Sequence, residues 1–164
     1  MKDRIIEESI ASLRREGLRF SVDTLAERLN ISKKTIYKYF PTKEALAVAL
    51  YQKYYADLKV QAESLAGEDS VTARFKLLSL YFDAKSMTSR DIFNKYKLNE
   101  AISSFTATEN ERLLNIVFSS LNCAISQQDK TVLRIVINGS FEKLCNEKIA
   151  PERVINWLVN QLWQ

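Results

Sequence analysis

Two helix starts only eleven residues apart constrain this chain of 164 residues more than any other feature. Ser21 and Ser32 can each accept a hydrogen bond from a backbone N–H group one turn further on, which is the usual way to cap a helix. An apolar pair flanks each serine at the spacing that fixes how the chain enters a helix. These pairs are Phe20 with Leu25 and Ile31 with Ile36. The window therefore predicts two short helices in close succession.

A turn and a stop complete this window. Asn30 tolerates the left-handed conformation that ends many helices, so the chain can turn sharply after Leu29. Pro41 ends the second helix, because proline lacks an N–H group and disfavours a helical conformation of the preceding residue. Thr42 then caps a further helix, with Lys43 at its first position. We expect the N-terminal half of the second short helix to face a ligand.

The chemistry of that second helix favours DNA as the ligand. Lysines and hydroxyl side chains at a helix start suit entry into the major groove, where they contact phosphates and base edges. The start of the following helix combines free N–H groups with a lysine, which suits a backbone phosphate. The second helix carries around its first turns Lys33, Lys34, Thr35, Tyr37 and Lys38.

The charge distribution agrees with this expectation. The whole chain has 24 lysine and arginine residues against 20 aspartate and glutamate residues, a net charge of +4. The stretch from Arg19 to Lys43 alone holds six cations and two anions, so the excess is concentrated there. A basic patch of this kind is typical of proteins that bind nucleic acid. The alternative is that the lysines only solvate a helical face, which is the usual role of a run of charges.

Residues 25–46 resemble TetR/AcrR-type bacterial transcriptional regulators through the run L-A-E-R-L-N-I-S-K-K-T-I-Y-K-Y-F-P-T-K-E-A-L, and the resemblance extends over residues 5–50. It implies contacts with bases and nearby phosphates for Lys33, Lys34, Thr35 and Tyr37, and contacts with phosphates for Tyr39 and Lys43. Ser21 completes the set of candidate DNA contacts. Tyr39 replaces the family's usual histidine and Asn30 its usual glycine. Tyrosine can still donate to a phosphate and asparagine can still make the turn, so both departures are compatible with the function.

The resemblance also implies a domain organisation and a function. Residues 1–47 would form a three-helix, helix-turn-helix DNA-binding domain, and residues 48–164 an all-helical domain that binds a ligand and dimerises. We expect a regulator, usually a repressor in this family, that binds a palindromic double-stranded operator as a homodimer and is released by a small apolar or aromatic effector. The alternative is a helical module that senses a small molecule and acts through protein partners without binding DNA.

Composition favours an all-α fold. Only 3 glycines and 2 prolines occur, and little of the sequence alternates between apolar and polar residues, which argues against a sheet. The remaining expected helices cover residues 2–16, 42–65, 70–85, 109–127, 129–147 and 151 onward. Gly17 would close the first of these, Asp129 would cap the fifth, and Pro151 would begin the last. Residues 92–105 are expected to be irregular or to form a short helix.

The C-terminal part supplies candidates for two further sites. Its last two helices are apolar on more than one face, so each needs two partners. The resemblance implies that they pair with their mates across a two-fold axis, and the candidates for that interface are Val136, Gly139, Ser140, Lys143, Trp157 and Gln161. Candidates for an apolar effector pocket are Phe75, Leu78, Tyr81, Phe82, Phe93, Tyr96, Phe105 and Phe118. Aromatic residues at helical spacing more often form plain core.

Catalysis is not expected. The chain has no histidine, which removes the commonest general base and the commonest metal ligand, and it has neither a glycine-rich phosphate loop nor a nucleophile elbow. Cys123 and Cys145 lack the spacing of a zinc site, so we expect buried thiols, with a redox-sensing pair as the alternative. No cofactor or metal is expected. No apolar run is long enough to span a bilayer, and the charged N-terminus is not a signal segment, which favours the cytoplasm.

Overall fold

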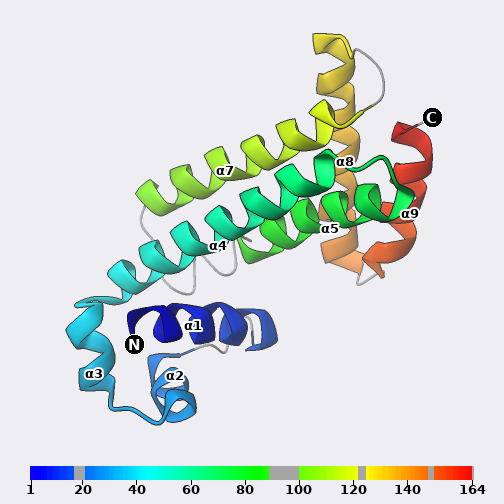
Figure 1. Cartoon of the computed structure of the whole chain (residues 1–164). Coiled ribbons are helices and arrows are strands. Elements are labelled where there is room, and N and C mark those ends of the chain that lie inside the picture. Colours follow the sequence, from blue (N-terminus) through cyan, green and yellow to red (C-terminus); the bar gives the residue numbers. More distant parts are fainter. Residues whose placement is uncertain (17–20, 89–99, 122–124, 148–149, 164) are drawn as a thin grey trace. The chain divides into compact units, whose positions relative to one another are not determined.

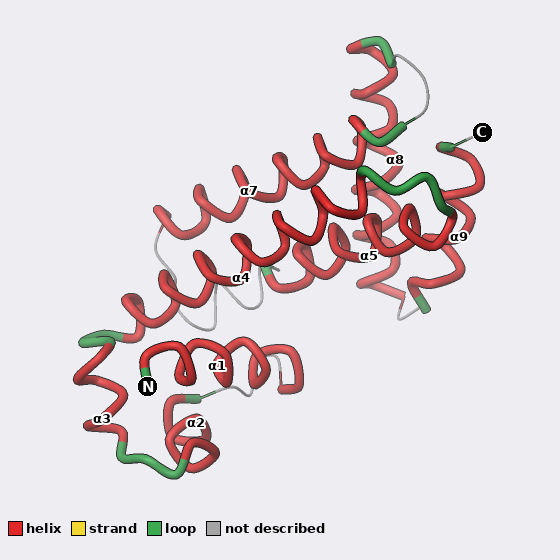
Figure 2. Tube along the Cα trace, in the orientation of Figure 1, coloured by secondary structure: helices red, strands yellow, loops and turns green. Residues whose placement is uncertain are grey.

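The computed structural model describes residues 1–16, 21–88, 100–121, 125–147 and 150–163. Within these ranges every regular element is a helix and no strand occurs (Figure 2). The predicted all-α fold class is therefore confirmed. The helices, labelled in Figure 1, are α1 Lys2–Glu16, α2 Val22–Leu29, α3 Lys33–Tyr39, α4 Lys43–Ala66, α5 Val71–Met87, α7 Glu100–Ser119, α8 Gln127–Glu147 and α9 Pro151–Leu162.

The chain divides into two compact units. The first contains Met1–Asp57 and Lys85–Glu109, and the second contains Leu58–Ala84 and Asn110–Gln164. Helices α4, α5 and α7 each contribute residues to both units. The domain boundary that the sequence predicts after residue 47 remains a prediction.

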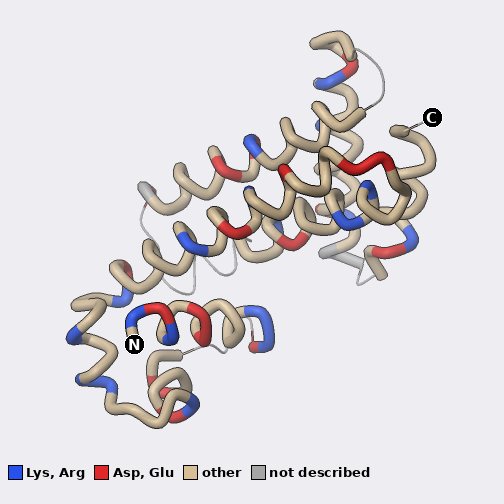
Figure 3. The backbone as a smooth tube through the Cα atoms, viewed as in Figure 1, with Lys and Arg blue, Asp and Glu red and all other residues tan. Residues whose placement is uncertain are grey.

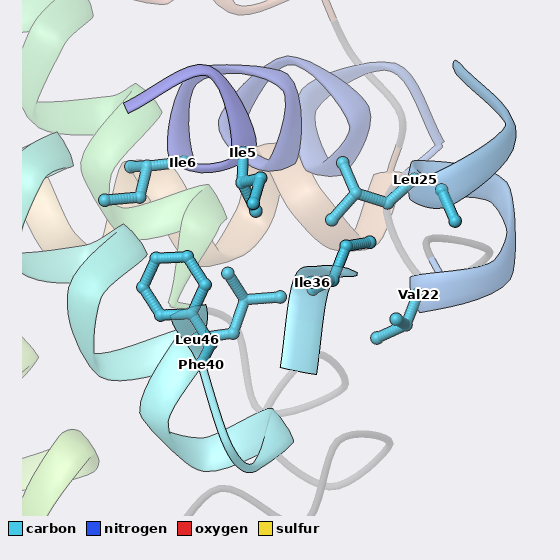
Figure 4. Packing of buried hydrophobic residues seen from close by; sticks show 8 residues of the cluster. Ile5, Ile6, Val22, Leu25, Ile36, Phe40 and Leu46 are labelled. Carbon is cyan, nitrogen blue, oxygen red and sulfur yellow. The ribbon is translucent and has the colours of Figure 1, made fainter. Parts of the chain in front are cut away.

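A small apolar core holds α1, α2 and α3 together in the first unit (Figure 4). Ile5 of α1, Leu25 of α2 and Ile36 of α3 are all fully buried, and their side chains meet at the centre of the cluster. The start of α4 closes the cluster with Leu46. Other residues of the cluster or packed against it, Ile6 and Ile10 on α1 and Val22 and Leu29 on α2, extend it at spacings of three or four residues. One face of each helix is therefore apolar, and the opposite face is left for solvent or a ligand.

The turn between α2 and α3 follows the prediction. Asn30 adopts the left-handed conformation, with φ 52° and ψ 48°. Its backbone N–H donates to the carbonyl of Glu27 at 3.0 Å, and the N–H of Ile31 donates to the carbonyl of Ala26 at 3.0 Å. These two hydrogen bonds form a Schellman motif, which satisfies the last carbonyls of α2. Asn30 therefore reverses the chain without leaving the end of α2 unpaired.

Replacing Asn30 with valine should destabilise the first unit by about 1–2 kcal/mol, because a β-branched residue is strained in the left-handed conformation. Denaturant unfolding followed by circular dichroism measures the change. Asn30→Gly is the matched control, since glycine adopts this conformation without strain and should retain the wild-type midpoint. Equal midpoints for the valine and glycine variants would contradict the assigned role of the turn.

Hydroxyl groups cap several helices as the sequence suggested. The Oγ1 atom of Thr42 accepts from the N–H of Ala45 at 3.1 Å, and the Oγ atom of Ser70 accepts from the N–H of Ala73 at 3.1 Å. The prediction that Asp129 caps α8 is wrong. Ser126 caps this helix by accepting from the N–H of Asp129 at 3.1 Å, while the Asp129 carboxylate accepts from the Ser126 hydroxyl at 2.6 Å.

The bounds predicted for one helix were also wrong. Helix α7 starts at Glu100 rather than near residue 109, and it ends at Ser119 rather than near residue 127. Its first half contains many serines and threonines, which disfavour helix interiors when taken alone. In the folded chain Thr106 and Thr108 donate back to the carbonyls of Ser103 and Ser104, both at 3.0 Å, and Ile102 is buried. Packing therefore overrides the weak helix propensity.

Helices in the second unit are joined by aromatic side chains. Phe82 of α5 stacks on Phe141 of α8, with ring centroids 5.8 Å apart and 13° between the ring planes. The Tyr81 hydroxyl donates to the side-chain oxygen of Asn138 at 2.7 Å. At the C-terminal end the indole N–H of Trp163 donates to the carbonyl of Ser120 at 2.9 Å. The first two contacts hold α5 against α8. The third joins Trp163, which follows α9, to Ser120, which follows α7.

Candidate nucleic-acid interface

The start of α3 is fixed by a cap and by a buried anchor. The Oγ atom of Ser32 accepts from the N–H of Thr35 at 3.1 Å, and the two hydroxyl groups lie 3.0 Å apart. One turn further on, Ile36 is fully buried in the core shared with α1 and α2. The cap and the anchor hold α3 at a defined rotation, so its other face is presented in a fixed orientation.

That other face is basic and partly aromatic. Lys34 and Lys38 are exposed, and Tyr37 and Tyr39 keep 36% and 40% of their surface accessible. Helix α3 contains no acidic residue, and Figure 3 shows blue segments without red along it. A shallow hollow runs along the same face and is lined by Ser32, Lys34, Thr35, Tyr37 and Lys38. Ammonium and hydroxyl donors arranged in this way can contact phosphates and base edges.

Two candidate DNA contacts already have partners at the start of α2. Lys33 forms an ion pair with Asp23, and both side chains are more than half exposed. The Ser21 hydroxyl lies 2.9 Å from the Thr24 hydroxyl and accepts from the N–H of Thr24 at 3.2 Å. From the sequence, Asp23 is expected only to favour the positive end of the α2 dipole. The ion pair with Lys33 depends on the geometry of the turn and was not predicted.

Lys43 lies at the first position of α4, next to the Thr42 cap, and its side chain is exposed. The structure thus brings Lys33, Lys34, Thr35, Tyr37 and Tyr39 together on one short helix, with Lys43 just beyond its end. Ser21 lies at the start of α2, on the helix that carries the ion-pair partner of Lys33.

A polar cluster that the sequence did not reveal joins α1 to α2. Arg28 forms an ion pair with Glu16, lies 3.8 Å from a carboxylate oxygen of Glu8, and donates to the Ser12 hydroxyl at 3.0 Å. Ser12 itself is fully buried. The three partners come from two consecutive turns of α1, so they fix the angle at which α2 is held. No local sequence signal identifies such a cluster, because it requires the register between two helices.

A family model described as bacterial regulatory proteins of the tetR family matches residues 5–50, which contain most of α1, all of α2 and α3, and the start of α4. This segment of the chain is of the tetR type. The assignment made from the sequence is therefore confirmed, and the basic face of α3 is the outer face of a helix-turn-helix motif.

One curated relative of this chain is the uncharacterised HTH-type transcriptional regulator YvaF of Bacillus subtilis (strain 168). The two proteins are 25% identical over 100 residues, which make up 61% of this chain and 52% of the relative. The chain thus spans about half the length of that relative. No solved structure matches the chain.

The residues predicted for a dimer interface are largely exposed. Trp157 of α9 keeps 58% of its surface accessible and Val136 of α8 keeps 39%. A Cβ atom added to Gly139 would meet nothing within 4 Å. Lys143 and Gln161 are exposed, and the half-buried Ser140 donates to the carbonyl of Val136 at 2.7 Å. Two further apolar side chains of α8 are exposed on the same side, Val132 at 58% and Ile135 at 67%.

The residues predicted for an effector pocket are mostly buried. In the second unit Leu78, Tyr81, Phe82 and Phe118 are buried and Phe75 is half-buried. Burial raises the pKa of the Tyr81 hydroxyl, so it stays protonated and donates to Asn138. Phe105 is half-buried in the first unit, where its ring meets Tyr55 edge to face at 5.9 Å. Phe93 and Tyr96 lie outside the described residues, as do Cys123 and the side chain of Cys145. The pocket remains a prediction.

Within the described ranges, no helix is long and apolar enough to cross a membrane. Among the same residues, no group of three or more histidine, cysteine, aspartate or glutamate side chains could hold a metal ion.

Proposed function

We propose that this tetR-family regulator binds a palindromic double-stranded DNA operator in the cytoplasm as a homodimer. In this proposal it represses the genes that the operator controls and is released by a small apolar or aromatic effector. The observation that carries the proposal is the outer face of α3, where exposed lysines and tyrosines surround a hollow and no acidic residue lies on the helix.

The chemistry of this face supports binding to DNA. Lys34 and Lys38 would neutralise phosphates and release their counterions, which makes the affinity strongly dependent on salt. Thr35 and Tyr37 have hydroxyl groups that can hydrogen-bond to base edges or phosphates. Tyr39 and Lys43 would contact the phosphate backbone beside the groove. Ile36 holds the helix against the core, so these groups can enter the groove without a change of fold.

The exposed apolar face of α8 supports the homodimer. Val132, Ile135, Val136 and Gly139 follow one another at intervals of three, one and three positions, so they form a single stripe along the helix. Exposed stripes of this kind commonly mark interaction sites. A second copy of α8 presents the same stripe, which is the self-complementarity that a two-fold interface requires. Gly139 has room for close approach of the two backbones.

The proposal is tested by binding of the purified full chain to labelled fragments that tile the DNA around its own gene. At least one fragment should bind about 10³-fold more tightly than mixed-sequence DNA, and this binding should weaken steeply between about 50 and 200 mM salt. Protection of two half-sites about one helical turn apart would fit a dimer on a palindrome. Equal binding to every fragment, or no binding at either salt concentration, would favour a module that acts through protein partners.

A further inference from the structure

The ion pair between Lys33 and Asp23 sets this lysine apart from the other cations at the candidate interface. The two residues of the ion pair lie at the starts of α3 and α2, on either side of the turn at Asn30. Within the described residues, no ion pair involves the exposed side chains of Lys34 or Lys38. Lys33 is thus a candidate DNA contact whose charge is already matched inside the free protein.

We propose that Asp23 competes with the DNA backbone for the ammonium group of Lys33 and thereby weakens binding to DNA of any sequence. The inference rests on the proposed function, because it requires that α2 and α3 face DNA. A carboxylate and a phosphate offer the same kind of anionic oxygen acceptor, so Lys33 can bind only one of them fully at a time. Asp23 therefore restrains Lys33 until a phosphate displaces it.

The exposure of the pair makes such an exchange feasible. The side chains of Lys33 and Asp23 keep 55% and 60% of their surface accessible, so the pair is well solvated. Exposed ion pairs of this kind are weak, so a phosphate contact can offset the loss of the pair. Once Lys33 has moved to the backbone, the carboxylate of Asp23 remains beside it and repels the same phosphates. Both effects lower the affinity for the duplex.

Asp23→Asn is the direct test, because asparagine keeps the shape of the side chain and removes only its charge. The probe is a short duplex of mixed sequence, which measures the backbone contribution without knowledge of the operator. The variant should bind this duplex about two- to five-fold more tightly than the wild type at low salt. In the wild-type complex Asp23 still holds Lys33 part of the time, so the plot of log K against log salt should steepen in the variant by up to about 0.9.

Two matched variants separate this mechanism from a general charge effect. Glu27→Gln removes the same charge from an exposed position one turn further along α2, and no described ion pair joins Glu27 to Lys33. It should leave the salt dependence unchanged. In a Lys33→Met background, Asp23→Asn should keep only the smaller gain that comes from the lost repulsion, because the group for which Asp23 competes is gone. Thermal unfolding checks that each variant is folded.

Three outcomes would overturn the inference. Equal affinities of Asp23→Asn and the wild type would do so while leaving DNA binding intact. An equal gain in the Lys33→Met background would assign the effect to long-range repulsion and not to competition. Failure of both the wild type and Asp23→Asn to bind mixed-sequence DNA or any genomic fragment would overturn the proposed function as well, which distinguishes that case from the other two.

Discussion

A chain in which Lys33, Lys34 and Tyr39 are all replaced by alanine should bind its operator at least about 100-fold more weakly than the wild type. The three side chains lie at the start and end of α3, and all are exposed. If each contact contributes about 1 kcal/mol, their joint loss accounts for that factor. The salt dependence should also become shallower, because two lysines no longer neutralise phosphates. Fluorescence anisotropy with a labelled operator fragment measures both changes.

The matched control removes two lysines from elsewhere. Lys59 of α4 and Lys76 of α5 are exposed, so a chain with both replaced by alanine has the same net charge as the triple variant. This control variant should retain nearly full affinity for the operator. The triple variant should keep its helical circular dichroism and its oligomeric state, since none of the three side chains lies in the core. If the control and the triple variant lose affinity equally, α3 is not the recognition helix.

Replacing Val136 with glutamate should weaken the proposed homodimer at least about 100-fold. In a two-fold interface the substitution places two carboxylates close together in an apolar surrounding, where unpaired charges are costly to desolvate and repel each other. Val136 keeps 39% of its surface accessible in the single chain, so the fold itself should tolerate the change. Sedimentation at micromolar concentration should show the wild type as a dimer and the variant as a monomer.

Gln127→Glu is the control for this experiment. Gln127 is exposed at the first position of the same helix, more than one turn before the stripe formed by Val132, Ile135, Val136 and Gly139 begins. That variant should remain dimeric. If the Val136→Glu variant is a monomer, it should also bind the operator more weakly, because two linked DNA-binding segments bind a palindrome far more tightly than one. A wild type that is monomeric at these concentrations would contradict the proposed interface.

The region between α2 and α3 was predictable because its structure is determined locally. The caps at Ser21 and Ser32 and the left-handed Asn30 each depend on neighbours only a few residues away, and each has the predicted geometry. The start of α9 at Pro151 was predicted for the same reason. Local rules of this kind do not require knowledge of the rest of the fold.

Features that depend on contacts between helices were not predictable. The first half of α7 has weak helix propensity, and burial of Ile102 and Thr106 explains why it is helical nonetheless. The partners of Lys33 and Arg28 likewise depend on how two helices are oriented relative to each other. The family resemblance identified the cations that face outward. It gave no indication that one of them is already paired.

The two sides of helix α3 have different roles. Ile36 supplies the anchor on the inner side, while Lys34, Tyr37 and Lys38 on the outer side are exposed. Surface side chains away from caps and buried networks usually change stability by less than about 0.5 kcal/mol when replaced. The outer side can therefore acquire a new base preference by single substitutions without first gaining stability elsewhere. A lineage built on this helix could exchange one operator for another through intermediates that are all folded.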